Sequence, residues 1–249
     1  MKPYNKDFLF KEIDKYRDII CERSCGNFKI VKSSIPKAKL KGYMYNEKEK
    51  YDMDVVELQE NEKCLMKLDL REIQGDYEAI NFAKGKVGIV GLGLGYTAQE
   101  IACKSNVEEV VVYEISSEII QMYNENFEKN DKIKIIQGDA FKAERETFDF
   151  FFVDIYNYKL TSKVVEDYKK FNEIHNIEEY SFWGMEHFLL SCSYEELLWI
   201  FIPENWVAMC KNLYEKLESS GYIEYYKPLG EKKVSRILAK FKEVLNADY

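Results

Sequence analysis

The sequence lacks the features of a secreted, membrane-spanning or metal-binding chain. No window holds the ~18 uncharged apolar residues that a membrane span needs, and the charged start MKPYNKDFLFKEIDKY lacks the apolar stretch of a signal peptide. The six cysteines form no CxxC pair, and two histidines are too few for an easily assembled metal ligand set. We therefore expect a cytoplasmic protein with reduced cysteines, no membrane partner and no bound metal.

An excess of positive charge is also missing. The 36 lysines and arginines face 44 acidic residues, which gives a formal net charge of −8, and no basic run interleaved with aromatic residues is evident. A negative surface repels phosphate backbones, so the sequence predicts no nucleic-acid partner. A small-molecule acceptor is the expected substrate, and the sequence leaves a homo-oligomeric state open.

Repeats, low-complexity tracts and glycine-serine linkers are absent, so the sections of the chain are expected to pack as one unit. A length of 249 residues suits one α/β domain with an appendage. Three sections are predicted. Residues 1–85 form an N-terminal helix and a β appendage, residues 86–160 form a core, and residues 161–249 form a helical region that completes the same domain.

Hydrophobic spacing predicts the elements of the appendage. Residues 6–21 place apolar side chains at helical intervals. From residue 27 to residue 70, short apolar or β-branched pieces are separated by Pro36, Gly42 and charged runs, which favours strands and hairpins. One such piece is YMY at 43–45. A short helix is expected over 75–83.

The core section repeats the order strand, turn, helix. Its strands are near-continuous apolar runs, which is typical of a parallel sheet covered on both faces, so the expected fold is a doubly wound, mainly parallel α/β domain. The predicted strands are VGIV (87–90), VEEVVVYEI (107–115), KIKIIQ (132–137) and FDFFFVDIY (148–156). After residue 158 only helices are expected, among them EEYSFWGMEHFLL (178–190) and NWVAMCKNLYEKLESS (205–220), and no further strand is evident.

The strongest motif is VGIVGLGLGYTAQEIA, in which an apolar strand runs into Gly91, Gly93 and Gly95 and then into a helix that opens with Tyr96. Glycine allows a tight turn with positive φ and lets a ligand approach the backbone at the start of the helix. A purely structural turn is the alternative. Three glycines at alternate positions favour a ligand.

Acidic residues end the strands that follow. Glu114 lies 23 residues after Gly91, where a carboxylate can accept hydrogen bonds from both hydroxyls of a ribose. Asp139 and Asp154 come at the ends of later strands, on the rim where open parallel sheets bind ligands. Capping of the next helix is the alternative role for both aspartates.

These elements, in this order, resemble the class I S-adenosylmethionine-dependent methyltransferases, including the spermidine-synthase-like branch, over residues 86–158. The whole chain also resembles uncharacterised bacterial methyltransferase-like proteins with a GLGLG turn, an FVD strand end and an aromatic helical tail. The resemblance implies a Rossmann-like methyltransferase fold and S-adenosyl-L-methionine as cofactor, bound by the 86–160 core. The implied activity is transfer of a methyl group to an acceptor.

The resemblance also assigns roles to residues. The glycine turn would pass along the amino-acid part of the cofactor, Glu114 would bind the ribose, and Asp139 with Ala140 would meet the adenine. Asp154 would orient the acceptor or take its proton, and Tyr156 would line the acceptor pocket, with Tyr158 as a second candidate and simple packing as the alternative for both tyrosines. Asp154 and Tyr156 are the expected catalytic residues. The residues expected to bind the cofactor are Gly91, Gly93, Gly95, Tyr96, Glu114, Ile115, Asp139 and Ala140.

Two other functions stay open. An aminopropyltransferase uses the same cofactor frame, but DIYNYK after the fourth strand has no second carboxylate to hold a polyamine. An NAD-binding oxidoreductase is the alternative by motif, because Gly93, Gly95 and Ala98 satisfy GxGxxA with Glu114 at the right distance, but a lone match is weak and the chain offers no evident second domain for a hydride acceptor. The role of Glu186 and His187 is equally open, between a base near neutral pH and a packed aromatic helix.

Overall fold

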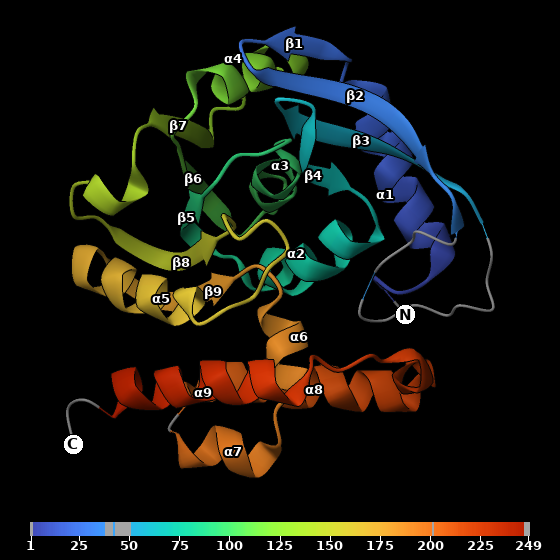
Figure 1. The fold of residues 1–249 in the computed structure, drawn as a ribbon. Helices are drawn as coiled ribbons and strands as arrows, with labels where there is room; N and C mark the ends of the chain where they lie inside the picture. The colour runs from blue at the N-terminus through green and yellow to red at the C-terminus, as the bar shows by residue number, and fades with distance from the viewer. Residues whose placement is uncertain (1, 38–41, 43–50, 201, 247–249) are drawn as a thin grey trace.

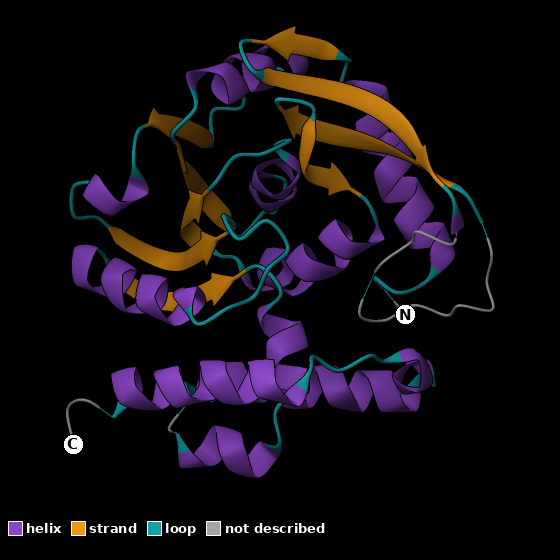
Figure 2. Ribbon diagram, in the orientation of Figure 1, coloured by secondary structure: helices purple, strands orange, loops and turns teal. Residues whose placement is uncertain are grey.

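The protein is built around two sheets. The structure, a computed structural model, describes residues 2–37, 42, 51–200 and 202–246. One sheet is antiparallel, with the strand order β1-β2-β3-β4, and the other is parallel, with the order β7-β6-β5-β8-β9. Helices flank the parallel sheet, and a layer of C-terminal helices lies beyond its β9 edge (Figures 1 and 2). The doubly wound α/β fold expected from the sequence is therefore confirmed.

The N-terminal section forms one helix and the antiparallel sheet. Asn5 caps the helix by accepting a hydrogen bond from the backbone N–H of Phe8, at 2.8 Å. The predicted piece at 43–45 lies outside the described residues. The elements of this section are α1 (Lys6–Ile19), β1 (Arg23–Cys25), β2 (Phe28–Ile35), β3 (Met53–Glu60) and β4 (Lys63–Leu68).

A helix joins the two sheets. This helix, α2 (Leu70–Phe82), begins almost directly after β4. Its start lies several residues before Gly75, where the sequence predicted that the helix begins. Its start is fixed by Asp69, whose buried carboxylate accepts hydrogen bonds from the backbone N–H groups of Arg71 and Glu72. Because this cap sits one residue after β4, the antiparallel sheet determines where the side chains of α2 lie.

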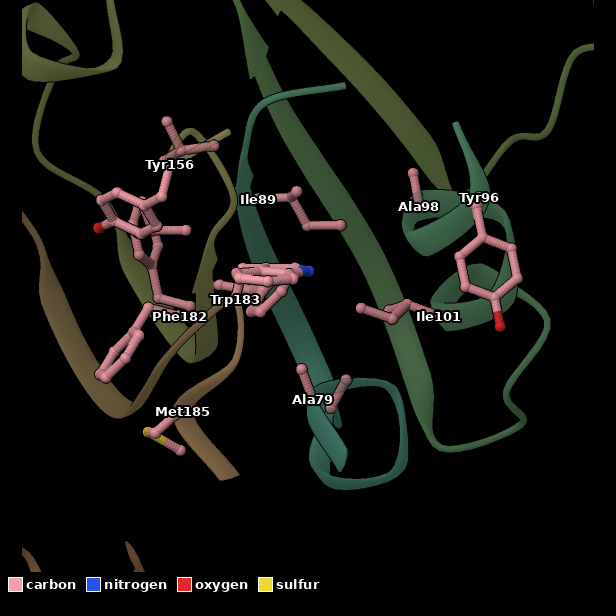
Figure 3. Close-up of a cluster of buried hydrophobic side chains, with 14 of the residues drawn as sticks. Ala79, Ile89, Tyr96, Ala98, Ile101, Tyr156, Phe182, Trp183 and Met185 are labelled. Carbon is pink, nitrogen blue, oxygen red and sulfur yellow. The ribbon is translucent and has the colours of Figure 1, made fainter. Parts of the chain in front are cut away.

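The parallel sheet carries the carboxyl ends of its strands to one edge. Val90 pairs with Tyr113 on one side and with Val153 on the other, so β5, β6 and β8 end together. Figure 3 shows buried side chains of α3, Ala98 and Ile101, beside Ile89 of β5. The strands and the helices between them are β5 (Gly85–Val90), α3 (Tyr96–Ala102), β6 (Val107–Glu114), α4 (Ser117–Asn126), β7 (Ile133–Gln137), η2 (Ala140–Lys142), β8 (Thr147–Val153), α5 (Lys163–Ile174) and β9 (Asn176–Phe182).

The strand β9 corrects the prediction that only helices follow residue 158. It pairs with β8 in parallel, from Thr147 opposite Asn176 to Val153 opposite Phe182. Two glutamates in its first half break the apolar run by which the other strands were recognised, while the aromatic residues of its second half are buried, as suits a strand. Gly184, with φ of 74°, then separates β9 from a short helix.

The C-terminal helices cover β9. The indole N–H of Trp206 donates a hydrogen bond to the backbone carbonyl of Tyr180, at 2.9 Å. The ring of Phe241 stacks on that of Phe182, with centroids 6.4 Å apart. The elements of this layer are α6 (Met185–Leu190), α7 (Tyr194–Trp199), α8 (Glu204–Ser219), η3 (Tyr222–Tyr225) and α9 (Glu231–Leu245).

Replacement of Phe182 by alanine should lower the free energy of unfolding by about 3–5 kcal/mol, because the ring is 1% exposed and packs against aromatic rings of three helices, α6, α8 and α9. Urea denaturation followed by circular dichroism measures this change. Trp199→Ala is the matched control, since Trp199 is 77% exposed and its removal should shift the free energy of unfolding by less than about 0.5 kcal/mol. Equal effects of the two substitutions would contradict the placement of β9 in the core.

Candidate active site

A cavity of about 330 Å³ lies at the carboxyl ends of β5, β6 and β8. The antiparallel sheet closes it from the other side with Phe28 of β2, Leu58 of β3 and Met66 of β4. The site is therefore shared between the two sheets. The predicted site residues that line this cavity are Gly91, Gly93, Tyr96, Glu114, Ile115 and Asp154.

The glycines of the turn are closely approached by atoms of neighbouring segments. Gly91 has φ of 98°, and a Cβ there would lie 2.5 Å from the backbone carbonyl oxygen of Asp154. Gly93 has φ of 52°, and a Cβ there would lie 2.3 Å from Sδ of Met66. Met66 also accepts a hydrogen bond from the backbone N–H of Leu94, at 3.3 Å. Only glycine satisfies both the backbone conformation and these close approaches.

Glu114 braces this turn from the end of β6. One carboxylate oxygen accepts a hydrogen bond from the backbone N–H of Leu92 at 3.0 Å, and the other accepts one from Ser116 at 2.8 Å. The side chain is buried, yet it lines the cavity. Each carboxylate oxygen has a further lone pair, so Glu114 can accept hydrogen bonds from a ligand while it orders the turn. Its neighbour Ile115 is 72% exposed at the rim.

Three carboxyl groups meet beside the turn. Glu72 and Asp76, both on α2, each have an oxygen within 4.8 Å of the other and of an oxygen of Asp154, which follows β8. Burial, reinforced by the two neighbouring carboxyls, raises the pKa of Glu72 well above its usual range. Burial and Asp154 do the same to the pKa of Asp76, and burial raises the pKa of Asp154 to about 7. The cluster therefore retains protons near neutral pH.

Asp76 is the member of the cluster with a fully buried oxygen that lacks a described partner. Its Oδ2 accepts a hydrogen bond from the hydroxyl of Thr97 at 2.6 Å, but its Oδ1 has no partner among the described residues, and the residue is fully buried. A buried oxygen without a donor is costly, so this corner suits a ligand that supplies a donor. An amino group does so, and a hard divalent cation is also compatible with carboxylate oxygens. The expected absence of a metal stays a prediction.

Sequence reasoning missed Glu72 and Asp76. They stand four residues apart and so share one face of α2, which is otherwise buried and mostly apolar. Two acids on such a face were the available signal.

Tyr158, rather than the expected Tyr156, faces the cavity. The Tyr158 hydroxyl accepts a hydrogen bond from the backbone N–H of Lys67 at 2.8 Å and donates one to its carbonyl at 3.1 Å. The loop reaches this position through Asn157 and Tyr158 at φ of 46° and 61°, a conformation that costs roughly 1–3 kcal/mol per residue. Tyr156 is instead buried in the hydrophobic core (Figure 3). It lines neither this cavity nor the second cavity that Tyr158 also lines.

Other predicted cofactor residues lie outside the cavity wall. Asp139 caps η2 by accepting a hydrogen bond from the backbone N–H of Phe141 at 3.0 Å, and it pairs with Lys142 at 3.7 Å. Ala140 is buried beside it. Gly95 precedes the first residue of α3 and packs toward Tyr123. None of these predicted residues lines the cavity.

The fold and this site define the class of protein. A parallel sheet with a glycine turn and acids at the ends of its strands forms one cavity, and the chain is a class I S-adenosylmethionine-dependent methyltransferase. The family model described as ribosomal RNA adenine dimethylase matches residues 39–184, which is more than half of the chain. The chain belongs to that family. Its cofactor is S-adenosylmethionine, as expected.

Solved structures give weaker likenesses. Trm5b from Pyrococcus abyssi is 17% identical, with 60% of this chain and 46% of that chain covered and a TM-score of 0.35. The spermidine synthase from Thermotoga maritima is 13% identical, with 50% and 49% covered and a TM-score of 0.35. The 23S rRNA methyltransferase ErmE is 20% identical, with 41% and 40% covered and a TM-score of 0.33. The chain thus spans about half the length of these proteins or less, and no curated protein matches it.

Family membership overturns one expectation. The prediction of no nucleic-acid partner is wrong, because the matching family is one of ribosomal RNA methyltransferases. The net charge of −8 misled because it sums over the whole surface, whereas recognition depends on local charge.

Within the described ranges, no helix combines the length and apolar character needed to cross a membrane.

Glu114→Gln should weaken binding of S-adenosylhomocysteine, the demethylated product, by about 10- to 100-fold. The substitution removes a charged acceptor, and hydrogen bonds to charged groups contribute about 1.5–3 kcal/mol. Calorimetry gives the affinity. Glu108→Gln, at an exposed position of the same strand, is the control and should bind normally. Normal affinity of a folded Glu114→Gln variant would restrict Glu114 to a structural role.

Asp154→Asn should raise the melting temperature relative to the parent protein more at about pH 8 than at about pH 5. The unfolded chain releases the proton of an aspartic acid near pH 4, whereas the folded protein keeps it up to about pH 7, so this group lowers stability as the pH rises through that window. Asparagine removes the effect. Asp131→Asn, whose side chain is 95% exposed, should show no such dependence on pH. A temperature difference that is constant with pH would contradict the raised pKa.

Proposed function

We propose that this protein transfers the methyl group of S-adenosylmethionine to an exocyclic amino group of a base in RNA. The observation that carries the proposal is the cluster of Glu72, Asp76 and Asp154, of which Glu72 and Asp154 line the cavity beside the glycine turn and Asp76 lies buried behind them. The family to which the chain belongs is described by adenine dimethylation of ribosomal RNA, which accords with an amino acceptor.

The residues around the glycine turn fit the cofactor. Gly91 and Gly93 leave the backbone uncovered where a Cβ would collide with its neighbours, and Glu114 offers carboxylate lone pairs to a ribose. When bound, the cofactor supplies an electrophilic methyl group. The protein then has to align an acceptor and exclude water, and Met66 with the apolar side chains of β2 and β3 covers the cavity on that side.

The acid cluster matches one edge of an aminated base. Adenine presents a ring nitrogen, which accepts a hydrogen bond, next to an amino group, which donates them, and cytosine does the same. A protonated carboxyl donates and an ionised carboxylate accepts. The raised pKa values of Glu72 and Asp76 keep at least one carboxyl protonated near pH 7. The cluster can thus read this edge without a basic residue.

Asp154 is the proposed proton acceptor. An amino nitrogen that gains a methyl group must lose a proton, and a general base works best when its pKa lies near the working pH. Burial brings the pKa of Asp154 to about 7. Glu72, with Asp76 buried behind it, orients the amino group, and Tyr158 holds the loop that carries Asp154. Tyr156 has no part in this proposal.

A second candidate is aminopropyl transfer to a polyamine. The sequence argued against it because DIYNYK offers one carboxylate, but the structure adds Glu72 and Asp76 from α2. Three neighbouring carboxyl groups complement a cationic amine. The same experiment separates the two candidates.

The test incubates the protein with unmodified transcribed ribosomal RNA and radiolabelled S-adenosylmethionine, followed by mass spectrometry of the nucleosides. We expect methylated adenosine, and Asp154→Asn should lower turnover by about 10²- to 10⁴-fold while cofactor affinity changes less than about tenfold. Asp131→Asn is the control. A chelator should leave the rate unchanged.

Three results would contradict the proposal. If Asp154→Asn turns over as fast as the parent protein, the Asp154 carboxylate is excluded as the base. Loss of activity with a chelator that magnesium restores would make the cluster a metal site. The second candidate would be favoured if the RNA acquires no label and the protein transfers an aminopropyl group from decarboxylated S-adenosylmethionine to a polyamine.

A further inference from the structure

A second cavity, of about 290 Å³, adjoins the first on the other side of Tyr158, which lines both. We refer to it as the outer chamber. It gathers segments that are far apart in the sequence: the start of α2, the loop after β8, the turn into α6 and the segment that leads into α9. Its walls include Arg71, Tyr158, Trp183, Glu186, Lys227 and Lys233.

The charged groups of the outer chamber are mostly positive. Arg71, Lys227 and Lys233 line it, and Glu186 is the one acid among its described wall residues. Burial, with the nearby Glu78 and Asp76, raises the pKa of Glu186 well above its usual range, which favours the neutral form of this acid. The chamber is thus a cationic enclosure in a protein whose formal net charge is −8.

Arg71 and Lys233 are available to an anion. Neither forms an ion pair with a described residue, and Nε of Arg71 has no hydrogen-bond partner there. The Arg71 guanidinium instead lies over the ring of Tyr158, with 3.4 Å between its central carbon and the ring centroid. His187 does not compete for an anion as a cation, because burial, with Lys233 nearby, lowers its pKa to about 4.

Two buried polar atoms in the same walls also lack hydrogen-bond partners among the described residues. Nε1 of Trp183 and Oε1 of Glu186 have none in the described part of the chain, although these residues are only 7% and 3% exposed. Trp183 packs closely against Gly75, where a Cβ would lie 2.5 Å from the indole nitrogen. An indole N–H can only donate, whereas a protonated carboxyl both donates and accepts. A ligand with acceptors and donors satisfies both atoms.

Aromatic surface completes the chamber. The rings of Tyr158 and Trp183 meet edge to face, with centroids 5.2 Å apart, at the boundary with the first cavity. Bases and sugars pack on such surfaces, and arginine and lysine bind phosphate. The combination of aromatic walls, paired cations and two unsatisfied polar atoms is complementary to a nucleotide.

We propose that the outer chamber binds a phosphate-bearing nucleotide of the RNA next to the base that is methylated. This inference rests on the proposed function. Arg71 and Lys233 contact the phosphate, while Trp183 and Glu186 contact the base or sugar. Tyr158 separates this nucleotide from the methylated base, and binding of the neighbour would fix the register of the substrate.

The first arm of the test needs no methylation. Protein saturated with S-adenosylhomocysteine, which fills the cofactor cavity, is titrated by calorimetry with adenosine 5′-monophosphate and with adenosine. The monophosphate should bind at least about tenfold more tightly, since a charged hydrogen bond contributes about 1.5–3 kcal/mol. Lys233→Glu and Arg71→Gln should each remove most of this difference. Lys232→Glu, the same charge change at the adjacent exposed position of α9, should preserve it.

The second arm uses a short adenine-containing RNA and fluorescence anisotropy. Lys233→Glu should weaken RNA binding at least about tenfold and reduce the slope of log affinity against log salt concentration by about 0.7, the value for one phosphate contact on a single strand. The affinity for S-adenosylhomocysteine should not change, and Lys232→Glu should have less than about a twofold effect on RNA.

The outcomes separate the inference from the proposed function. Equal affinity for adenosine and its monophosphate, or a phosphate effect that survives both Lys233→Glu and Arg71→Gln, overturns the outer chamber as a phosphate site even when RNA is methylated. A phosphate effect that depends on Lys233, in a protein that neither binds nor methylates RNA, overturns RNA as the source of the phosphate. Loss of the effect in Lys232→Glu as well would reduce it to general electrostatics and contradict the inference.

Discussion

Three carboxyl groups share one buried corner between α2 and the end of β8, and there is not enough water around Glu72 and Asp76 to solvate their charges. Such a cluster opposes folding unless it keeps protons or meets a donor. The surrounding structure must therefore hold it in place. The antiparallel sheet does so, because β4 leads directly into α2 and its Lys67 backbone anchors Tyr158. The N-terminal section is in this sense part of the active site.

The parts of the site that the sequence predicted are local along the chain. The glycine turn and Glu114 belong to one strand-turn-helix-strand unit, so their spacing alone indicates that they meet. Glu72 and Asp76 reach Asp154 only through the packing of α2 across the sheet, and periodicity does not reveal such a contact. Tyr156 and Tyr158 are two residues apart in the sequence. Because the backbone at 157 and 158 is left-handed, the Tyr156 ring lies in the core and the Tyr158 ring lies at the cavity.

The fold was predictable where hydrophobicity is continuous and less so at its edge. The strands β5, β6 and β8 contain nearly unbroken apolar runs, which is typical of strands buried on both faces. In β9, exposed Glu178 and half-buried Glu179 dilute that pattern, and the aromatic second half is followed almost directly by the helix α6. Pairing with β8 decides between strand and helix, so the strand is a product of tertiary structure.

The double hydrogen bond between Tyr158 and the backbone of Lys67 has a thermodynamic consequence. The same side chain forms a wall of the cofactor cavity and a wall of the outer chamber, and it is tied to a strand that covers the first of them. Any ligand that displaces the ring in one cavity alters the shape of the other. If that displacement changes affinity, reciprocity requires the two ligands to influence each other by the same factor. Through this one tyrosine, a ligand in the cofactor cavity and a ligand in the outer chamber would then be coupled.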